Sequence, residues 1–203
     1  MLKPYFIYSI KFVLLMFTFG FSMYGTFYSY VEFGLWNIHY FTNQSNLLVF
    51  LTTFLMVFGW DKNRFFKAVA LIALIDIILT GVVYNVLLKD LVLGFTETQL
   101  FIMLVTHTIV PMLYTVLYLV YVLDKPSPKA IKLMLIHPLL YFVIFQIIGL
   151  FTNDYPYPFM DPNQGILKMI ITVFLVMAPL LILTGFGLIH LKRYLYDTLK
   201  LEA

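Results

Sequence analysis

The feature that most constrains this chain is a series of long apolar stretches, each ended by charged or turn-forming residues. There are six such stretches, at about residues 5–31, 40–60, 66–88, 98–123, 130–151 and 166–191. A helix needs roughly 20 mostly apolar residues to cross a bilayer, whereas a barrel strand needs only about 9–11 alternating ones. The run lengths therefore predict an all-α polytopic membrane protein, with one bundle of six transmembrane helices over residues 1–203.

The composition supports the bilayer as the solvent of this chain. Only 11% of its residues are charged and 62% are hydrophobic, whereas a soluble domain has about 25% charged residues. Six spans and short loops occupy the whole length, so we expect no separate soluble domain. The first apolar run is too long for the core of a secretory signal, and we expect it to be retained as a span.

Lysine and arginine are distributed unevenly between alternate loops. Eleven of the 13 lie in the N-terminal segment, after the second and fourth stretches, or at the C-terminus, and only Lys89 and Lys168 lie in the other loops. Cytoplasmic loops of membrane proteins carry such an excess of positive charge. We therefore expect both termini in the cytoplasm, the loop that follows residue 151 outside, and the chain in the cell membrane.

Several kinds of site are excluded or disfavoured by composition. The chain has no cysteine, which rules out disulfides, thiolate metal sites and cysteine nucleophiles. Its basic residues are too scattered for a nucleic-acid surface, and no histidine pair has metal-ligand spacing. We therefore expect no nucleic-acid partner, metal or cofactor, and the oligomeric state stays open.

A dense polar run opens the second apolar stretch. It consists of Thr42, Asn43, Gln44, Ser45 and Asn46, of which the first, fourth and fifth share a helical face. Polar groups in a membrane are costly unless they are paired. The run therefore predicts either hydrogen bonds between helices or a functional site.

His107 lies in the fourth stretch, roughly 11–14 Å deep at 1.5 Å per residue. Pro111, four residues later, cannot donate to the carbonyl of His107, so we expect that carbonyl to be free and the helix to be kinked. A histidine beside a kink is suited to catalysis or ligand binding. The alternative is a buried histidine that bonds a neighbouring helix.

Asp76 lies in the third stretch, roughly 15 Å from the cytoplasmic end. It shares a helical face with Thr80 and Tyr84. A carboxylate at this depth must be paired, protonated or solvated by a cavity. Because the estimated depths of Asp76 and His107 are similar, we expect these two residues to pair, although a protonated, hydrogen-bonded aspartic acid is the alternative.

The outer loop of residues 152–161 contains alternating tyrosine and proline, which stiffen it. It is expected either to cap an outward-facing cavity or to act as a plain connector. Its Tyr157 is a candidate substrate-binding residue, as are Tyr84 and Tyr114 in the predicted spans. The remaining histidines are weaker candidates: His39, His137 and His190.

Three motifs resemble the androgen-induced/FAR-17a-like family, which includes androgen-dependent TFPI-regulating protein and bacterial relatives. The motifs are the run YFTNQSN at residues 40–46, His107-Thr108 with Pro111, and Tyr157-Pro158-Phe159 before the last stretch. The resemblance implies a six-span hydrolase that cleaves fatty acid esters of hydroxy fatty acids. It further implies a threonine nucleophile at the start of the second span and a histidine base in the fourth, which match Thr42 and His107.

The chemistry of these residue types agrees with that implication. A threonine hydroxyl is a weak nucleophile until a base takes its proton, and histidine is the usual base. Asp76 is the candidate for orienting the imidazole, by the logic of a hydrolytic triad. By residue count Thr42 lies about 3 Å into its span, roughly 8–11 Å shallower than His107, a gap that a boundary shift of a few residues, helix tilt or the Pro111 kink must close. Candidates for oxyanion and substrate contacts are Asn43, Gln44, Ser45 and Asn46.

Three functions are therefore open from the sequence. The first is an intramembrane lipid ester hydrolase, and the second is an acyltransferase on the same scaffold. The third is a small transporter or lipid-binding protein in which Asp76 and His107 relay protons. No inverted repeat or pair of broken helices is evident, which argues against transport. The expected partners are membrane lipids and a lipid ester substrate.

Overall fold

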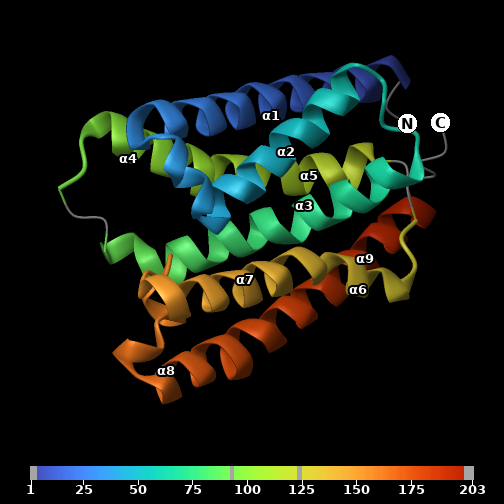
Figure 1. Cartoon of the computed structure of the whole chain (residues 1–203). Helices are drawn as coiled ribbons and strands as arrows, with labels where there is room; N and C mark the ends of the chain where they lie inside the picture. The colour runs from blue at the N-terminus through green and yellow to red at the C-terminus, as the bar shows by residue number, and fades with distance from the viewer. Residues whose placement is uncertain (1–3, 92–93, 123–124, 199–203) are drawn as a thin grey trace.

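The computed structural model describes residues 4–91, 94–122 and 125–198 (Figure 1). Within these ranges every regular element is a helix and no strand occurs. The all-α prediction is therefore confirmed. This outcome follows from the long apolar runs, because a helix satisfies all of its backbone hydrogen bonds within one segment.

The longer helices correspond closely to the predicted spans. The α-helices are α1 (Pro4–Phe33), α2 (Phe41–Val57), α3 (Arg64–Val83), α4 (Glu97–Leu104), α5 (Val110–Tyr121), α6 (Ile131–Met134), α7 (Ile136–Thr152), α8 (Ile166–Ile170) and α9 (Ala178–Thr198). Three π-helical segments extend or join them: η2 (Tyr84–Leu88), η4 (Val105–Ile109) and η8 (Ile171–Met177). Short 3-10 turns lie between them: η1 (Leu35–His39), η3 (Lys89–Leu91), η5 (Pro128–Ala130), η6 (Pro158–Met160) and η7 (Pro162–Gln164).

In the part of the chain that the structure describes, five continuous helices are long and apolar enough to cross a membrane. They cover Tyr8–Phe33, Arg64–Leu88, Glu97–Tyr121, Pro128–Thr152 and Ile166–Thr198. The chain is therefore of the multi-pass membrane type. The remaining predicted span corresponds to α2, whose 17 residues fall short of the roughly 20 that a crossing normally needs.

The helix α3 is central to the bundle, with α2 and α5 on one side and α7 and α9 on the other (Figure 1). Its fully buried Leu74 and Ile75 belong to the main core, together with Val49 of α2 and Leu117 of α5. The last helix is peripheral, and its most apolar window contains no buried residue. Large exposed side chains are therefore common on the outer helices, as expected of faces that meet lipid rather than water.

The start of α1 and the end of α9 lie at the same end of the bundle (Figure 1). Two contacts fasten α9 there. Lys192 is fully buried and donates to the carbonyls of Tyr118 and Leu119 at the end of α5, and Lys125 forms an ion pair with Asp197. A lysine at a helix C-terminus neutralises carbonyls that have no partner within the helix.

The segment before α2 determines how deep that helix begins. Gly34, with φ of 83°, reverses the chain after α1 in a conformation that favours glycine. The turn η1 then leads the backbone back into the bundle, so that α2 begins among the other helices (Figure 1). The first turn of α2 consequently lies well inside the bundle instead of at its rim.

Candidate active site

Thr42 and His107 meet at the start of α2. The Thr42 Oγ1 atom lies 3.1 Å from His107 Nε2, although the two residues are 65 positions apart in the chain. The gap of roughly 8–11 Å counted along the sequence is closed, because η1 carries the start of α2 inward. His107 lies ten residues beyond the start of α4, about 15 Å along the helix at 1.5 Å per residue.

The other ring nitrogen of His107 determines its tautomer. Nδ1 lies 3.0 Å from the carbonyl oxygen of Met103 and 2.9 Å from Thr106 Oγ1. The Thr106 hydroxyl donates its own hydrogen to the carbonyl of Ile102, and a carbonyl can only accept. Nδ1 therefore carries the hydrogen, and the lone pair of Nε2 faces the Thr42 hydroxyl.

Two π-helical segments bring the imidazole and its neighbouring ring together. Tyr84 opens η2 and His107 lies in η4, and their rings stack with centroids 4.0 Å apart. Such π segments occur frequently at functional sites. The stack on one side and the Met103 carbonyl on the other hold the imidazole in one orientation.

Pro111 has the predicted effect on the carbonyl of His107. That oxygen accepts a hydrogen bond from Asn85 Nδ2 at 3.2 Å, in place of the backbone donor that proline lacks. Gly81 of α3 permits this close approach, since a Cβ atom there would lie 3.1 Å from the His107 oxygen and from Pro111 Cβ. The site therefore depends on close packing of α3 against η4 and α5.

Asp76 does not pair with His107, so its predicted role in orienting that imidazole is wrong. The Asp76 side chain is fully buried, and its Oδ2 lies 2.7 Å from Nδ1 of His137 in α7. The reason is depth: His107 is level with Tyr84, which follows Asp76 by eight residues, or about 12 Å of helix. The Met103 carbonyl takes the position that Asp76 was expected to fill.

The polar run at the start of α2 mostly stabilises the backbone. Its amide nitrogens donate to carbonyls: Asn43 to Asn37, Gln44 to Ile38, and Asn46 to both Thr42 and Thr106. The Ser45 hydroxyl bonds Thr80 at 2.6 Å. The predicted oxyanion role of these side chains is therefore not supported, since their donors already hold η1, α2 and η4 together.

The three candidate tyrosines have different environments. Tyr84 stacks on His107, whereas Tyr114 is fully buried and donates to the carbonyl of Ala70, away from Thr42. The Tyr157 hydroxyl accepts a hydrogen bond from the Thr42 backbone N–H at 3.4 Å. Only Tyr157 therefore combines contact with Thr42 and access to the cavity described next.

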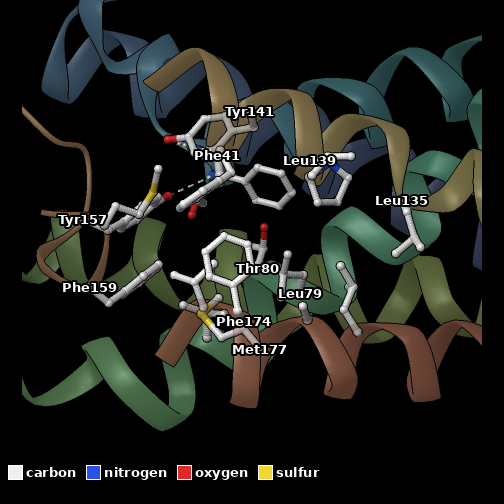
Figure 2. A pocket seen from close by; sticks show the side chains of 18 of the residues that line it. Phe41, Leu79, Thr80, Leu135, Leu139, Tyr141, Tyr157, Phe159, Phe174 and Met177 are labelled. Atoms are coloured by element: carbon white, nitrogen blue, oxygen red, sulfur yellow. Dashed lines mark hydrogen bonds between the residues drawn. The ribbon is translucent and has the colours of Figure 1, made fainter. Parts of the chain in front are cut away.

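An apolar cavity of about 300 Å³ adjoins Thr42. Its walls come from α3, α7, η8 and α9, and Figure 2 shows Tyr157 and Phe159 toward one end and Leu135 toward the other. Thr42 and Thr80 are among the few polar residues in the lining, with the tyrosines Tyr141 and Tyr157. A polar spot on an otherwise apolar wall suits a ligand with an apolar chain and one reactive polar group.

Sequence reasoning gave too little weight to Tyr141 and His137. The Tyr141 hydroxyl accepts from the Phe41 N–H at 3.1 Å and donates to the carbonyl of His39 at 2.9 Å. It thereby caps α2, whose N-cap residue Tyr40 makes no side-chain cap. His137 could have been connected with Asp76, because both lie seven to ten residues from the cytoplasmic ends of their predicted spans.

Within the described ranges, no group of three or more His, Cys, Asp or Glu side chains is arranged to hold a metal ion. No protein-family model matches the chain. Searches of curated proteins and of solved structures also give no match. The functional argument therefore rests on the residues of this chain and their geometry.

Proposed function

We propose that this protein is an intramembrane lipid ester hydrolase in which Thr42 is the nucleophile and His107 is the base. The observation that carries the proposal is the 3.1 Å contact between Thr42 Oγ1 and His107 Nε2. It joins a hydroxyl to a nitrogen that is held as an acceptor by the Met103 carbonyl. Hydrolases that form a covalent intermediate have this arrangement: the nucleophile is within hydrogen-bond reach of the base, and the base is within reach of a group that orients it.

The reaction would proceed in two balanced halves. Thr42 Oγ1 bonds to the ester carbonyl carbon while its proton passes to His107 Nε2, and collapse of the tetrahedral intermediate breaks the bond to the alcohol oxygen. The departing alkoxide takes the proton from His107. Water then attacks the acyl-Thr42 ester in the same way, and the acid is released as Thr42 regains its proton.

The substrate would be an amphiphilic ester with a long apolar chain. The cavity next to Thr42 is lined by apolar side chains, and each methylene that leaves water contributes about 0.8 kcal/mol. Fatty acid esters of hydroxy fatty acids fit this description, in keeping with the resemblance to the androgen-induced/FAR-17a-like family. We propose membership of that family on the same motifs.

We also propose six membrane spans with both termini cytoplasmic, in the cell membrane. Two observations support this arrangement. The start of α1 and the end of α9 lie at one end of the bundle (Figure 1), and 11 of the 13 lysine and arginine residues lie near the termini or after the second and fourth stretches, as the positive-inside rule expects of cytoplasmic segments. In this arrangement α2 is the second span along the chain and joins the five longer helices to make six. Because α2 is short, η1 fills the part of the membrane thickness that α2 does not cross.

The test is turnover of a long-chain ester by the purified protein, with labelling by an alkyl fluorophosphonate. We expect the wild type to hydrolyse the ester and to be labelled at Thr42. Thr42→Ala and His107→Ala should each abolish turnover, and the double variant should be no worse, because the two residues act as one unit. Wild-type rates in both single variants would disprove the proposal.

The products separate hydrolysis from acyl transfer. A hydrolase releases free fatty acid even when an acceptor alcohol is present, whereas an acyltransferase forms a new ester with that alcohol. Thr42→Ser offers a further check, since it keeps the hydroxyl group and should retain part of the activity. Activity that survives in Thr42→Ala alone would point to Ser45, which lies one helical turn away, or to a water activated by His107.

A further inference from the structure

The hydroxyl of Tyr157 lies beside the proposed nucleophile but has no role in the reaction steps described above. It lies on the wall of the apolar cavity and accepts a hydrogen bond from the Thr42 backbone N–H at 3.4 Å. A phenol that accepts one hydrogen bond keeps its own hydrogen for donation. Two donors, one O–H and one N–H, therefore lie next to the nucleophile.

The outer loop holds this hydroxyl in place. The Tyr157 ring stacks on Phe159 with centroids 5.2 Å apart and contacts the ring of Tyr40 edge-on at 5.8 Å. Gln146 of α7 donates to the Met160 carbonyl at 2.7 Å. The loop is therefore anchored on both α2 and α7, and its tyrosine is positioned by ring packing that does not involve the hydroxyl.

We propose that the Tyr157 O–H and the Thr42 N–H together form the oxyanion hole of this esterase. When Thr42 Oγ1 attacks the ester, the π electrons of the carbonyl move onto its oxygen, which would accept hydrogen bonds from both groups. The proton of Thr42 still passes to His107, and Tyr157 donates a hydrogen bond without losing its proton. This assignment rests on the proposed hydrolase function.

Two further features of the site support the assignment. Thr42 lies in the first turn of α2, where the helix dipole favours negative charge. Burial raises the pKa of the Tyr157 hydroxyl above its ordinary value, so it remains a donor at neutral and mildly alkaline pH. The neighbouring Tyr141 cannot take this role as readily, because its hydroxyl already donates to the carbonyl of His39.

The test is Tyr157→Phe, which removes the hydroxyl and keeps the ring that packs on Phe159 and Tyr40. We expect kcat for a long-chain ester to fall about 10²–10³-fold, as for the loss of one oxyanion donor, with KM little changed. Tyr155→Phe is the matched control. It removes a hydroxyl from the same loop and keeps the ring that lies against Gly149, and its kcat should match the wild type.

A second readout separates catalysis from structure. An alkyl trifluoromethyl ketone forms an anionic adduct with the nucleophile, so Tyr157→Phe should weaken its binding in parallel with kcat, whereas binding of the matched alkyl amide should be unchanged. If Tyr157→Phe unfolds, a fluorotyrosine at position 157 changes the acidity of the hydroxyl and should change kcat. An active wild type with an equally active Tyr157→Phe variant overturns the oxyanion assignment alone. A wild type without turnover or labelling at Thr42 overturns the hydrolase proposal and this one with it.

Discussion

The carboxylate of Asp76 faces His137, with Oδ2 2.7 Å from Nδ1 of that ring. The opposite nitrogen of His137 lies 3.1 Å from Gln44 Oε1, and the ring stacks on Phe41 with centroids 5.2 Å apart. This second polar cluster therefore joins α3, α7 and the residues that flank Thr42. Its position indicates that it holds the start of α2 against two other helices.

This pair should affect stability more than chemistry. His137→Leu leaves the fully buried Asp76 without a partner, and removal of one member of a buried pair costs about 3–5 kcal/mol. We expect the low end of that range, because His137 is partly exposed. The double variant Asp76→Leu/His137→Leu should recover much of the loss, since apolar replacement of a whole pair is often neutral.

Thermal unfolding in detergent would measure both effects, with turnover of the remaining folded protein as the second readout. Asp76→Asn should keep more activity than His107→Ala, because Met103 and not Asp76 orients the base. A double variant as unstable as His137→Leu would contradict this explanation. So would an Asp76→Asn variant that is fully folded and inactive.

Gly81 provides a test of how closely the helices must approach. In Gly81→Ala the new Cβ would lie 3.1 Å from the carbonyl oxygen of His107 and from Pro111 Cβ, so α3 must move away from η4. We expect a lower unfolding temperature and reduced turnover, since Tyr84 on the same helix stacks on His107.

Gly20→Ala is the matched control for that change. Gly20 is also in a helix interior, but nothing lies within 4 Å of its Cβ position. Alanine there should stabilise the protein by up to about 1 kcal/mol, from helix propensity alone. Equal behaviour of the two variants in thermal unfolding would show that close packing at Gly81 is unimportant.

The parts of this structure that sequence could predict are those set by local chemistry. Apolar run length predicted the helices, and the missing donor of Pro111 predicted the free carbonyl that Asn85 now bonds. The resemblance of residues 40–46 and of His107-Thr108 to a known family pointed to Thr42 and His107, which the structure brings within 3.1 Å. Each of these inferences needs only a few neighbouring residues.

The errors arose where distances between helices mattered. Depth was estimated by counting residues from predicted span ends, and this method takes no account of the inward path of η1 or of the π segments η2 and η4. Asp76 was consequently matched with His107, although it lies about two helical turns from Tyr84, the neighbour of His107. The partners of the polar run were unpredictable for the same reason, since many are backbone carbonyls on other elements.

The proposed topology can be tested with single cysteines, because the native chain contains none. Ser127 and Gln164 are both exposed, and they lie shortly before α6 and α8, two helices at opposite ends of the bundle (Figure 1). An impermeant maleimide added to intact cells should label Gln164→Cys but should label Ser127→Cys only after the membrane is opened. The reverse pattern would invert the orientation, and labelling of both from outside would rule out the six-span arrangement.

The far end of the cavity should determine which chain lengths are accepted. Leu181 of α9 and Leu135 both line the cavity. Tyr141 contacts the start of α2 next to Thr42 and follows Leu135 by six residues, so Leu135 lies about 9 Å along the helix from the level of Thr42. A tryptophan at position 181 would fill that end. Esters with long chains should then lose kcat/KM by about fourfold for each methylene that no longer fits, at about 0.8 kcal/mol each, while short-chain esters should be unaffected.

The measurement is kcat/KM over a homologous series of p-nitrophenyl esters, from butyrate to palmitate. Leu183→Trp serves as the control, because Leu183 lies on the same helix but is 68% exposed and is absent from the cavity lining. Its chain-length profile should match the wild type, whereas the optimum of Leu181→Trp should move to shorter chains. An unchanged profile in Leu181→Trp would mean that the ester chain lies elsewhere, and an equal shift in both variants would assign the effect to a general disturbance of α9.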